Sequence, residues 1–551
     1  MELRRQRHLD RAIAAHQLVA VRAGNSRAVR ALKIHMADEN GNFGSAESDP
    51  LRRYVPLAAW VIAIFTVLVI PLKIISYGYL PVDDILGDSA KAVSGKPWPE
   101  ILVLRPAFIM DHHIGWHWLL REIYLWSHCS TESLVLVAVA GMFVLSGWSA
   151  MACLKRPEAW LATLIVFGLS SPVIQRLMLG RQFALTLTAL VVILLLWQRH
   201  GSTPPKWGTF AWMTALITLT VFLHGVWYLW ALPVAAFFLA RQFRWCFMLA
   251  ASCVVGTILA SALTGHPVEY IWQALKLALR VESIHRTQST LVQEMKPAAG
   301  NFLGLLLLGF LLVARQLAKI NAPPMTRNPA FWLMAMCWVL GCQTVRFWLD
   351  WGAPALMVLM AGDLQLFLQS RFAEDSFKRL GLVCGLALAT YAVSTNDVNS
   401  RWTFNLPQQY LTLKEHPDTL KGWMPGKGGI LYSPDMTIFY QTFFKNPNGD
   451  WRYAVGFEPA FMTDEDFAVY QNFLWNDGDA KALKPWVDKM RLQDRLVSRA
   501  PRNAPPGIPQ LEWNYAVSGI WIGRLPRNDT NGAPATIPAT EARTNSPSSK
   551  Q

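Results

Sequence analysis

The sequence predicts a polytopic α-helical membrane protein with a small α/β domain near its carboxyl end. Three observations lead to this fold class. Of the 551 residues, 52% are hydrophobic and only 16% are charged; the apolar residues gather in long blocks; and basic residues recur in every second connection between the blocks. The mean hydropathy of +0.23 is likewise typical of a chain that resides in a membrane.

The first 53 residues form a basic segment that we expect in the cytoplasm. Its opening sequence, MELRRQRHLDRAIAAHQ, lacks the continuous apolar core that a cleavable signal peptide needs. We therefore predict that the amino terminus stays on the cytoplasmic side of the membrane.

Apolar segments follow along most of the chain. They occupy residues 55–72, 133–153, 159–174, 183–197, 208–223, 226–240, 245–263, 302–314, 330–345, 352–368 and 380–394, within a domain that we place at 54–395. These eleven segments predict about 11 transmembrane helices. Several of them are shorter than the roughly 20 residues that cross a bilayer as a helix.

The charges between these segments indicate the orientation of the chain. Counted from a cytoplasmic amino terminus, the even-numbered connections are all basic: 155–156, 199–206, 241–244, 315–327 and 371–379. Cytoplasmic loops carry the excess of Lys and Arg, so these connections should face the cytoplasm. The net charge of +14 thus reflects topology and not nucleic-acid binding, and we expect a multi-pass protein of the bacterial inner (plasma) membrane.

The odd-numbered connections should face outward, and two of them are long loops at 80–132 and 264–300. Each contains a stretch that fits an amphipathic helix lying in the membrane interface. In the first of these helices, Trp116 and Trp126 fall on the expected apolar side and His117 on the expected polar side.

Residues 396–525 are more polar and predict a soluble α/β domain on the extracytoplasmic side. Short β-like runs (GGILYS, WRYAVGF and SGIWIGRL) alternate with helical pieces, one of which begins at Thr463 with Asp466 spaced as in a capping box. The last stretch, 526–551, has too few apolar residues to fold and is expected to be a disordered tail.

Paired acids open the first outer loop and are the strongest candidates for chemistry. Asp83, Asp84 and Asp88 lie within PVDDILGDSAKAVSGKPW, just after the first helix leaves the membrane. A carboxylate there can act as a general base on an acceptor hydroxyl where a lipid-linked substrate would present its headgroup. The competing interpretation is a solvated turn.

Polar residues also mark the other outer ends of the helices. These candidate substrate-binding residues are His112, His113, Arg176, Arg181, His224, Glu294, Arg346 and Asp350. Single charges at helix ends can simply reach the interface, but these come from several connections on one side, so a fold that gathers them would form one polar cavity. Arginines in such a cavity would suit a phosphate leaving group, because they make charge-assisted bonds where negative charge develops.

A metal site is not defined by the sequence. His113 and His117 have the i, i+4 spacing that could clamp a metal, but no acid completes a recognised motif and an interfacial helix explains both residues equally well. The sequence identifies no cofactor with certainty, and a divalent cation would be able to share the work of holding a phosphate.

The layout of these features resembles the GT-C superfamily of integral membrane glycosyltransferases. The shared features are a first helix, a large outer loop that opens with paired acids (Asp83 and Asp84), two interfacial helices, many spans and a carboxy-terminal outer domain. In that superfamily an acid at the start of the first outer loop is the catalytic base and the sugar donor is a polyprenyl phosphate, so the resemblance implies these roles here. The chain lacks the WWDYG-like signature of oligosaccharyltransferases.

We therefore expect a membrane glycosyltransferase that moves a sugar from a polyprenyl-phosphate donor to an extracytoplasmic glycan, lipid or protein, with inversion at the anomeric carbon. Asp83 or Asp84 would take the proton, and Arg176, Arg181 and Arg346 would hold the lipid phosphate. The bilayer is the other expected partner, and nucleic acid is not.

Two other classes of function stay open at the level of sequence. A transporter of a lipid-linked or small polar substrate would place ionisable residues or broken helices near the bilayer midplane, for which Pro233 and Asp363 are the candidates. A non-catalytic envelope assembly protein would leave the outer acids and arginines without a shared purpose.

Overall fold

The computed structural model of this chain describes residues 50–526 except 109, 202, 285–296, 298–301, 321, 405, 407–412, 414–419 and 518. The expected cytoplasmic segment up to residue 49, the expected tail from residue 527 and much of the second outer loop, including Glu294, lie outside the described residues.

Helices dominate the amino-terminal three quarters of the described chain. Seven are long and apolar enough to cross a membrane: Arg52–Ser76, Thr131–Cys153, Phe183–His200, Trp207–His224, Phe243–Leu263, Val345–Arg371 and Phe377–Thr395. Shorter apolar helices cover Pro157–Gly168, Trp227–Leu239, Phe302–Leu317 and Pro329–Gly341. Each of these helices coincides with one of the predicted apolar segments, and the multi-pass membrane fold is thereby confirmed.

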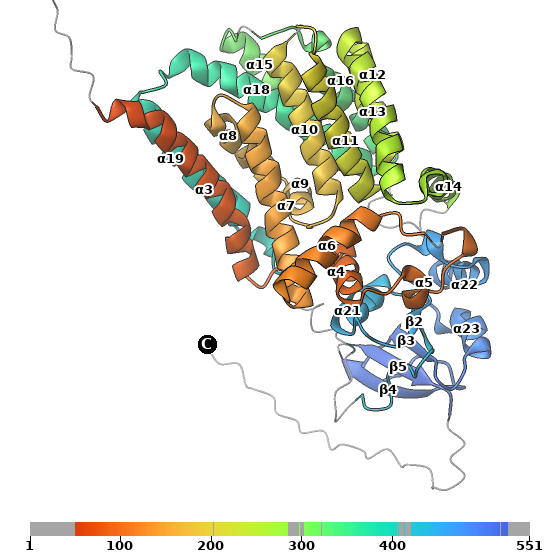
Figure 1. Ribbon diagram of the computed structural model, residues 1–551. Helices are drawn as coiled ribbons and strands as arrows, with labels where there is room; N and C mark the ends of the chain where they lie inside the picture. The colour runs from red at the N-terminus through yellow and green to blue at the C-terminus, as the bar shows by residue number, and fades with distance from the viewer. Residues whose placement is uncertain are drawn as a thin grey trace, which may run out of the picture.

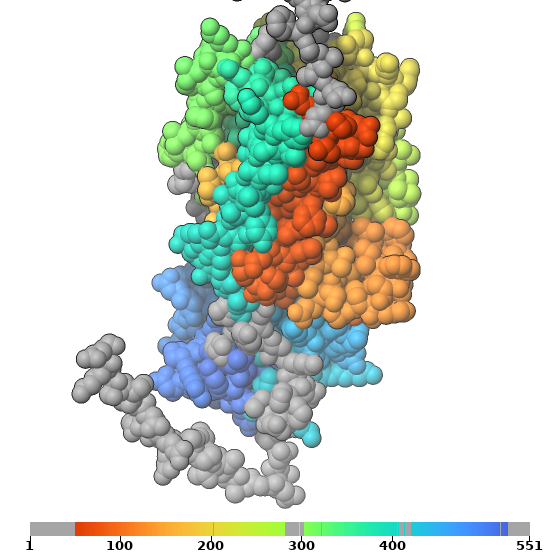
Figure 2. All heavy atoms as spheres, turned by 90° about the vertical axis from the view of Figure 1, so that its left-hand side faces the viewer, coloured from red at the N-terminus to blue at the C-terminus, as the bar shows by residue number. Residues whose placement is uncertain are grey.

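The long helices pack into a bundle with the remaining elements at one end (Figure 1). In chain order the main bundle helices are α3 (Val55–Ser76), α7 (Thr131–Cys153), α8 (Pro157–Gly168), α9 (Ser171–Leu177), α10 (Phe183–His200), α11 (Trp207–His224), α12 (Ala231–Leu239), α13 (Phe243–Leu263), α15 (Phe302–Leu317), α16 (Pro329–Gly341), α17 (Val345–Phe347), the π-helical turn η7 (Trp348–Gly352), α18 (Ala353–Arg371) and α19 (Phe377–Thr395). The first and last of them, α3 and α19, lie side by side along one flank, where Figure 2 shows them crossing the bundle together.

Two buried ion-pair groups stabilise the bundle away from the outer acids. Arg379 donates to both carboxylate oxygens of Glu158, at 2.7 and 3.1 Å, and Arg156 lies 3.4 Å from the same carboxylate. In α18, Asp363 pairs with Arg315 of α15 at 2.7 Å. Charged groups in a membrane segment are costly unless paired, so the ion pair accounts for Asp363, the ionisable residue that had suggested a transporter.

The first outer loop folds into short helices against the end of the bundle. They are α4 (Asp84–Ser94), α5 (Trp98–Ile101) and α6 (Ile114–Ser127). In α6 the structure differs from the expected division of faces: Trp116 and His117 are both buried, whereas Trp126 is 88% exposed. His117 turns inward because two carboxylates bind it there. The second amphipathic helix, α14 (Pro267–Ile284), forms as expected.

A five-stranded sheet forms the core of the carboxy-terminal region. Its order is β2 (Arg452–Tyr453), β1 (Ile430–Tyr432), β3 (Arg495–Arg499), β5 (Ile520–Arg524) and β4 (Glu512–Val517). The first three strands of this order are parallel and the other pairs are antiparallel. The strands expected from GGILYS, WRYAVGF and SGIWIGRL correspond to β1, β2 and β5.

Helices α21 (Met436–Lys445), α22 (Asp464–Trp475) and α23 (Lys484–Lys489) complete this region, which we call the carboxy-terminal domain. Thr463 caps α22 by accepting a bond from Asp466 N, as the capping box predicts. Figure 1 shows the domain against α4, α5 and α6, at the end of the bundle where the candidate acids lie.

The first outer loop also extends the sheet of this domain. Leu102 forms a parallel bridge with Tyr453, and the backbone N–H of Val103 donates to Tyr453 O at 2.9 Å. The N–H of Arg105 donates to Phe461 O, also at 2.9 Å. Because the loop covers the β2 edge, the outer loop and the carboxy-terminal domain form one continuous layer over the end of the bundle.

Candidate active site

The acid pair sits at the amino-terminal end of α4. Asp83 is the N-cap of this helix, and its carboxylate accepts a bond from Asp84 N at 2.7 Å. Arg181, from the turn before α10, pairs with both acids: its Nη2 contacts Asp84 Oδ2 and lies 3.3 Å from Asp83 Oδ1. One arginine thus holds two adjacent carboxylates, which would otherwise repel each other.

Asp84 has a second partner from a distant part of the chain. The hydroxyl of Tyr440, on α21, donates to Asp84 Oδ1 at 2.6 Å. The two oxygens of this carboxylate therefore bind different groups, one from the bundle and one from the carboxy-terminal domain.

A buried chain of charged groups lies one turn further along α4. His117 bonds Asp88 Oδ1 through Nε2 at 2.9 Å and Asp111 Oδ2 through Nδ1 at 2.6 Å. Lys91 Nζ reaches the same Asp111 oxygen at 2.9 Å, and Trp116 Nε1 donates to Asp88 Oδ2 at 3.1 Å. We call Asp88, Lys91, Asp111 and His117 the charge ladder.

The charge ladder favours an ionised His117 and an ionised Asp111. Burial by itself lowers the pKa of His117, but Asp111 and the bonds to both carboxylates outweigh it, and the pKa is raised above 6.5. Burial by itself raises the pKa of Asp111, but His117 and Lys91 hold it well below its usual value. An imidazolium donates from both nitrogens, which is what two flanking carboxylates require.

Three more histidines gather beside the ladder. His113 receives a bond from Gln182 Nε2 at 2.7 Å, and its ring centre lies 3.9 Å from that of His112 and 5.8 Å from that of His224. Thr186 Oγ1 lies 3.0 Å from His224 Nδ1. These three imidazoles form the histidine cluster.

Two members of the histidine cluster are kept neutral by their surroundings. Burial lowers the pKa of His112 to about 4, and His117 and Arg346 contribute in the same direction. Burial, together with the other histidines, holds the pKa of His113 well below its usual value. Neutral imidazoles offer one donor and one acceptor each, so at neutral pH the cluster can bind a polar ligand without adding positive charge.

Arginines border the histidine cluster on the bundle side. Arg176 binds Asp350 with two bonds of 2.6 and 2.9 Å, and Arg346 Nε shares an oxygen of the same carboxylate at 3.1 Å. Asp350 lies in the π-helical turn η7, an irregularity that is frequent at functional sites. The charges of Arg346, Arg181 and Arg176 all act on His224, and each of these arginines is also paired with a carboxylate.

Close backbone contacts fix the position of His112. Gly225 ends α11 with φ +76°, and a Cβ placed on it would lie 2.6 Å from His112 O. Gly115 meets α11 in the same way, since a Cβ there would lie 2.5 Å from Phe222. Glycine permits both the left-handed turn and the close approach.

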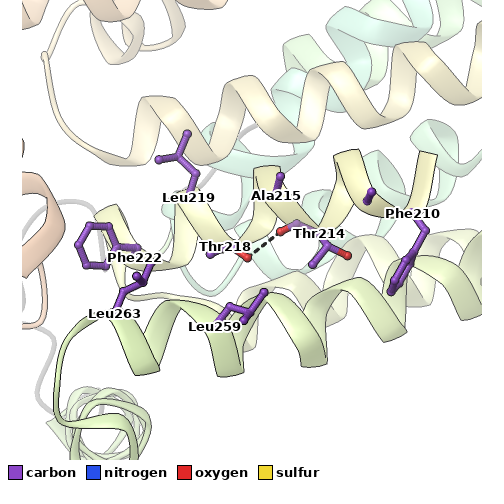
Figure 3. A pocket seen from close by; sticks show the side chains of 9 residues that line it. Phe210, Thr214, Ala215, Thr218, Leu219, Phe222, Leu259 and Leu263 are labelled. Carbon is purple, nitrogen blue, oxygen red and sulfur yellow. Dashed lines mark hydrogen bonds between the residues drawn. The ribbon is translucent and has the colours of Figure 1, made fainter. Parts of the chain in front are cut away.

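An apolar groove runs along the flank of the bundle. It has a volume of about 520 Å³ and lies between α11 and α13, lined by Phe210, Thr214, Thr218, Leu219, Phe222, Leu259 and Leu263 among others (Figure 3). Phe222, one of these residues, also lies against Gly115 of α6.

The structure brings most of the predicted site residues to one end of the bundle. They form three groups. Arg181 contacts Asp83 and Asp84, and Asp350 contacts Arg176 and Arg346. The ring of His113 lies between those of His112 and His224. Asp88 is 4% exposed and bound within the charge ladder. Glu294 lies outside the described residues.

Several residues of the site were not predicted from the sequence. Tyr440 gave no signal, because it is 356 positions from the acid that it binds. Lys91 could have been suspected from its i, i+3 spacing to Asp88 on the same helix, whereas Asp111 lies six residues before His117 and outside α6. His117 was considered as a metal ligand, but both its nitrogens are bound by carboxylates. Within the described part of the chain, no group of three or more His, Cys, Asp or Glu has a geometry that could hold a metal ion.

No family model matches the chain, and no curated protein matches its sequence. The similar solved structures include the following two. The Archaeoglobus fulgidus oligosaccharyltransferase, solved with a tethered acceptor peptide, aligns over 83% of this chain and 70% of its own, at 11% identity and a TM-score of 0.45. The arabinofuranosyltransferase AftD from Mycobacteria aligns over 87% of this chain and 40% of its own, at 14% identity and a TM-score of 0.48.

Both of these structures are glycosyltransferases by name. At 11% and 14% identity the likeness concerns the fold, and the chain spans less than half of the arabinofuranosyltransferase. The function is therefore argued from the residues of the site.

Proposed function

We propose that this protein is an inverting membrane glycosyltransferase of the extracytoplasmic face of the bacterial inner membrane. It would take a sugar from a polyprenyl-phosphate donor and transfer it to a hydroxyl-bearing acceptor. The observation that carries the proposal is the gathering of a carboxylate pair, neutral imidazoles and arginines at one end of an apolar bundle, beside a groove that fits a lipid chain.

The acid pair would supply the general base. In a single displacement the acceptor oxygen forms a bond to the anomeric carbon, the bond from that carbon to the phosphate oxygen breaks, and polyprenyl phosphate leaves. The acceptor proton passes to Asp83 or Asp84. Proton transfer by a positioned carboxylate contributes on the order of 10²–10⁴ to a rate. Arg181 would hold both carboxylates in position for this step.

Arg176 and Arg346, beside the histidine cluster, would bind the departing phosphate. Asp350 neutralises part of their charge, and neutral His112 and His113 add hydrogen-bonding groups without adding positive charge. Negative charge on the leaving phosphate grows as the glycosidic bond breaks, so interactions with these groups strengthen most in the transition state.

The groove between α11 and α13 would hold the lipid chain of the donor. Its lining is apolar apart from threonines, of which Thr218 bonds Thr214 O of its own helix at 2.8 Å. A polyprenyl chain in this groove would place its phosphate near Phe222, which lies against α6. This arrangement suits an amphiphilic donor better than a water-soluble nucleotide sugar.

The proposal is tested by sugar transfer from synthetic polyprenyl-phosphate donors with the purified protein in lipid. Asp83→Asn and Asp84→Asn are the informative variants, because asparagine preserves size and caps helices about as well as aspartate. Loss of turnover by on the order of 10²-fold or more in one variant would identify the base.

Glu100→Gln is the matched control, since Glu100 is an exposed acid of the same outer loop. It should leave turnover unchanged. Full activity in both aspartate variants would overturn the proposed role of the acid pair, and turnover of nucleotide sugars in place of lipid-linked ones would overturn the donor class.

A further inference from the structure

The carboxy-terminal domain reaches the acid pair through one side chain. Tyr440 is 8% exposed, and its hydroxyl lies 2.6 Å from Asp84 Oδ1 and 3.4 Å from Phe457 O. Its helix, α21, packs directly on α4, where a Cβ on Gly87 would lie 3.6 Å from Phe439. The two helices therefore lie close together, and the tyrosine reaches the acid across this contact.

The contacts that hold the domain in place come from the same outer loop as the acids. Lys96 Nζ donates to Gly449 O at 2.8 Å. Arg105 donates through Nε to Met462 O at 3.3 Å and pairs with Asp464. Together with the backbone bridge at Leu102, these contacts set the position of α21 relative to α4.

We propose that Tyr440 is a positioning residue for Asp84, and that docking of the carboxy-terminal domain on the first outer loop completes the active site. This inference rests on the proposed role of the acid pair in catalysis. It assigns the domain a task inside the site, in addition to any contact that it makes with an acceptor.

The physical basis is the division of the Asp84 carboxylate between two donors. Arg181 binds Oδ2 and Tyr440 binds Oδ1, so the plane of the carboxylate is fixed at both ends. A hydrogen bond to an ionised group is stronger than one between neutral groups and favours the ionised form. Without Tyr440, Asp84 would rotate more freely and would accept a proton more readily.

Reaction of Asp84 with dicyclohexylcarbodiimide tests the inference without relying on sugar transfer. This reagent reacts with protonated carboxyl groups within membranes to give a stable N-acylurea, which mass spectrometry of the peptide that carries Asp84 can localise. For Tyr440→Phe in lipid, we expect labelling several-fold faster than in the wild type, with its pH dependence moved about one unit upward. Phenylalanine keeps the ring and its packing on Phe439.

Tyr470→Phe is the matched control, because Tyr470 is buried in the same domain but lies on α22, away from the acids. It should label like the wild type. Equal labelling of Tyr440→Phe and the wild type at every pH would overturn the inference, and so would equally fast labelling of both tyrosine variants, which would indicate general loosening.

A second variant keeps the test valid if Tyr440→Phe folds poorly. Arg105→Ala removes a docking contact without touching either acid, and it should also speed the labelling of Asp84. Unchanged labelling would contradict the proposed link between docking and the acid. In a sugar-transfer assay, Tyr440→Phe should lower kcat and shift its acid limb to higher pH with little change in the KM of the donor.

Discussion

At the scale of single residues, the surroundings of His112 oppose protonation of its imidazole. Its ring stacks on Phe461, with ring centres 5.3 Å apart, and lies beside His113. Burial lowers its pKa from 6.5 to about 4. The unfolded chain therefore binds more protons than the folded protein between these two values.

Stability should consequently fall as the pH falls from 6.5 to about 4, because protons are then taken up by the unfolded state. We predict that His112→Gln, which cannot be protonated, unfolds with a weaker pH dependence over this window. Thermal unfolding in lipid nanodiscs at several pH values measures the effect. His266→Gln is the control, since the side chain of His266 is 65% exposed. The prediction would be contradicted if the unfolding temperature of His112→Gln changed with pH as steeply as that of the wild type.

At the scale of elements, the charge ladder joins α4 to α6. Its central residue, His117, is 6% exposed and bonded to two carboxylates. Arg121 adds to the same joint by donating to Ala92 O and Val93 O at 2.7 and 2.8 Å, which caps the carboxyl end of α4. The two helices therefore behave as one unit, and the acids at the start of α4 take their position from it.

We predict that His117→Ala destabilises the protein by about 3–5 kcal/mol, the usual cost of leaving a buried charge without its partner. The loss should be smaller when His117→Ala is combined with Asp88→Asn, because the unpaired carboxylate is then absent. Unfolding in detergent measures both. Glu122→Ala, on the exposed face of α6, is the control and should change stability by about 0.5 kcal/mol or less. If the effects of His117→Ala and Asp88→Asn on stability were strictly additive, the proposed coupling between the two residues would be refuted.

The turn between α11 and η3 (Trp227–Trp230) is a second element on which the site depends. Gly225 and Gly265 both have left-handed φ angles, +76° and +77°, but only Gly225 faces a near neighbour, His112 O. Alanine in a left-handed conformation costs roughly 1–2 kcal/mol by itself. We predict that Gly225→Ala costs more than Gly265→Ala and also impairs sugar transfer, since the added methyl group displaces His112. Similar losses of stability and activity in both variants would contradict this.

At the scale of the whole molecule, the orientation of the bundle decides which face of the membrane the site serves. Helices α4 and α6, which begin at the acid pair and at His113, lie at the same end of the bundle as the carboxy-terminal domain (Figure 1). The basic connections predict that the opposite end is cytoplasmic. The two statements together predict that the site lies outside the cytoplasm.

We predict that an impermeant maleimide labels Asp479→Cys in intact cells, whereas it labels Lys206→Cys only after the membrane is permeabilised. Both positions are exposed, one in the carboxy-terminal domain and one in a basic connection. The parent chain, with its own cysteines, provides the background signal. Labelling with the opposite pattern would invert the topology and place the site in the cytoplasm.

The sequence by itself determined the membrane class, the positions of the apolar helices and the acid motif after the first helix. These features are local: apolar length and the alternation of charge follow from what a bilayer accepts at each position of the chain. The capping box at Thr463 and three strands of the carboxy-terminal sheet were predictable for the same reason. Strands β3 and β4 were missed, because RLVSR and EWNYAV alternate too weakly to stand out.

Only the tertiary structure decided which polar groups meet. The sequence suggested that the outer arginines are free to hold phosphate, but the fold pairs Arg181 with the acids and Arg176 with Asp350. It also turned His117 into the centre of the charge ladder and brought Tyr440 to Asp84. Such pairings join residues that are far apart in the chain, and a buried charge is stable only where packing supplies its partner.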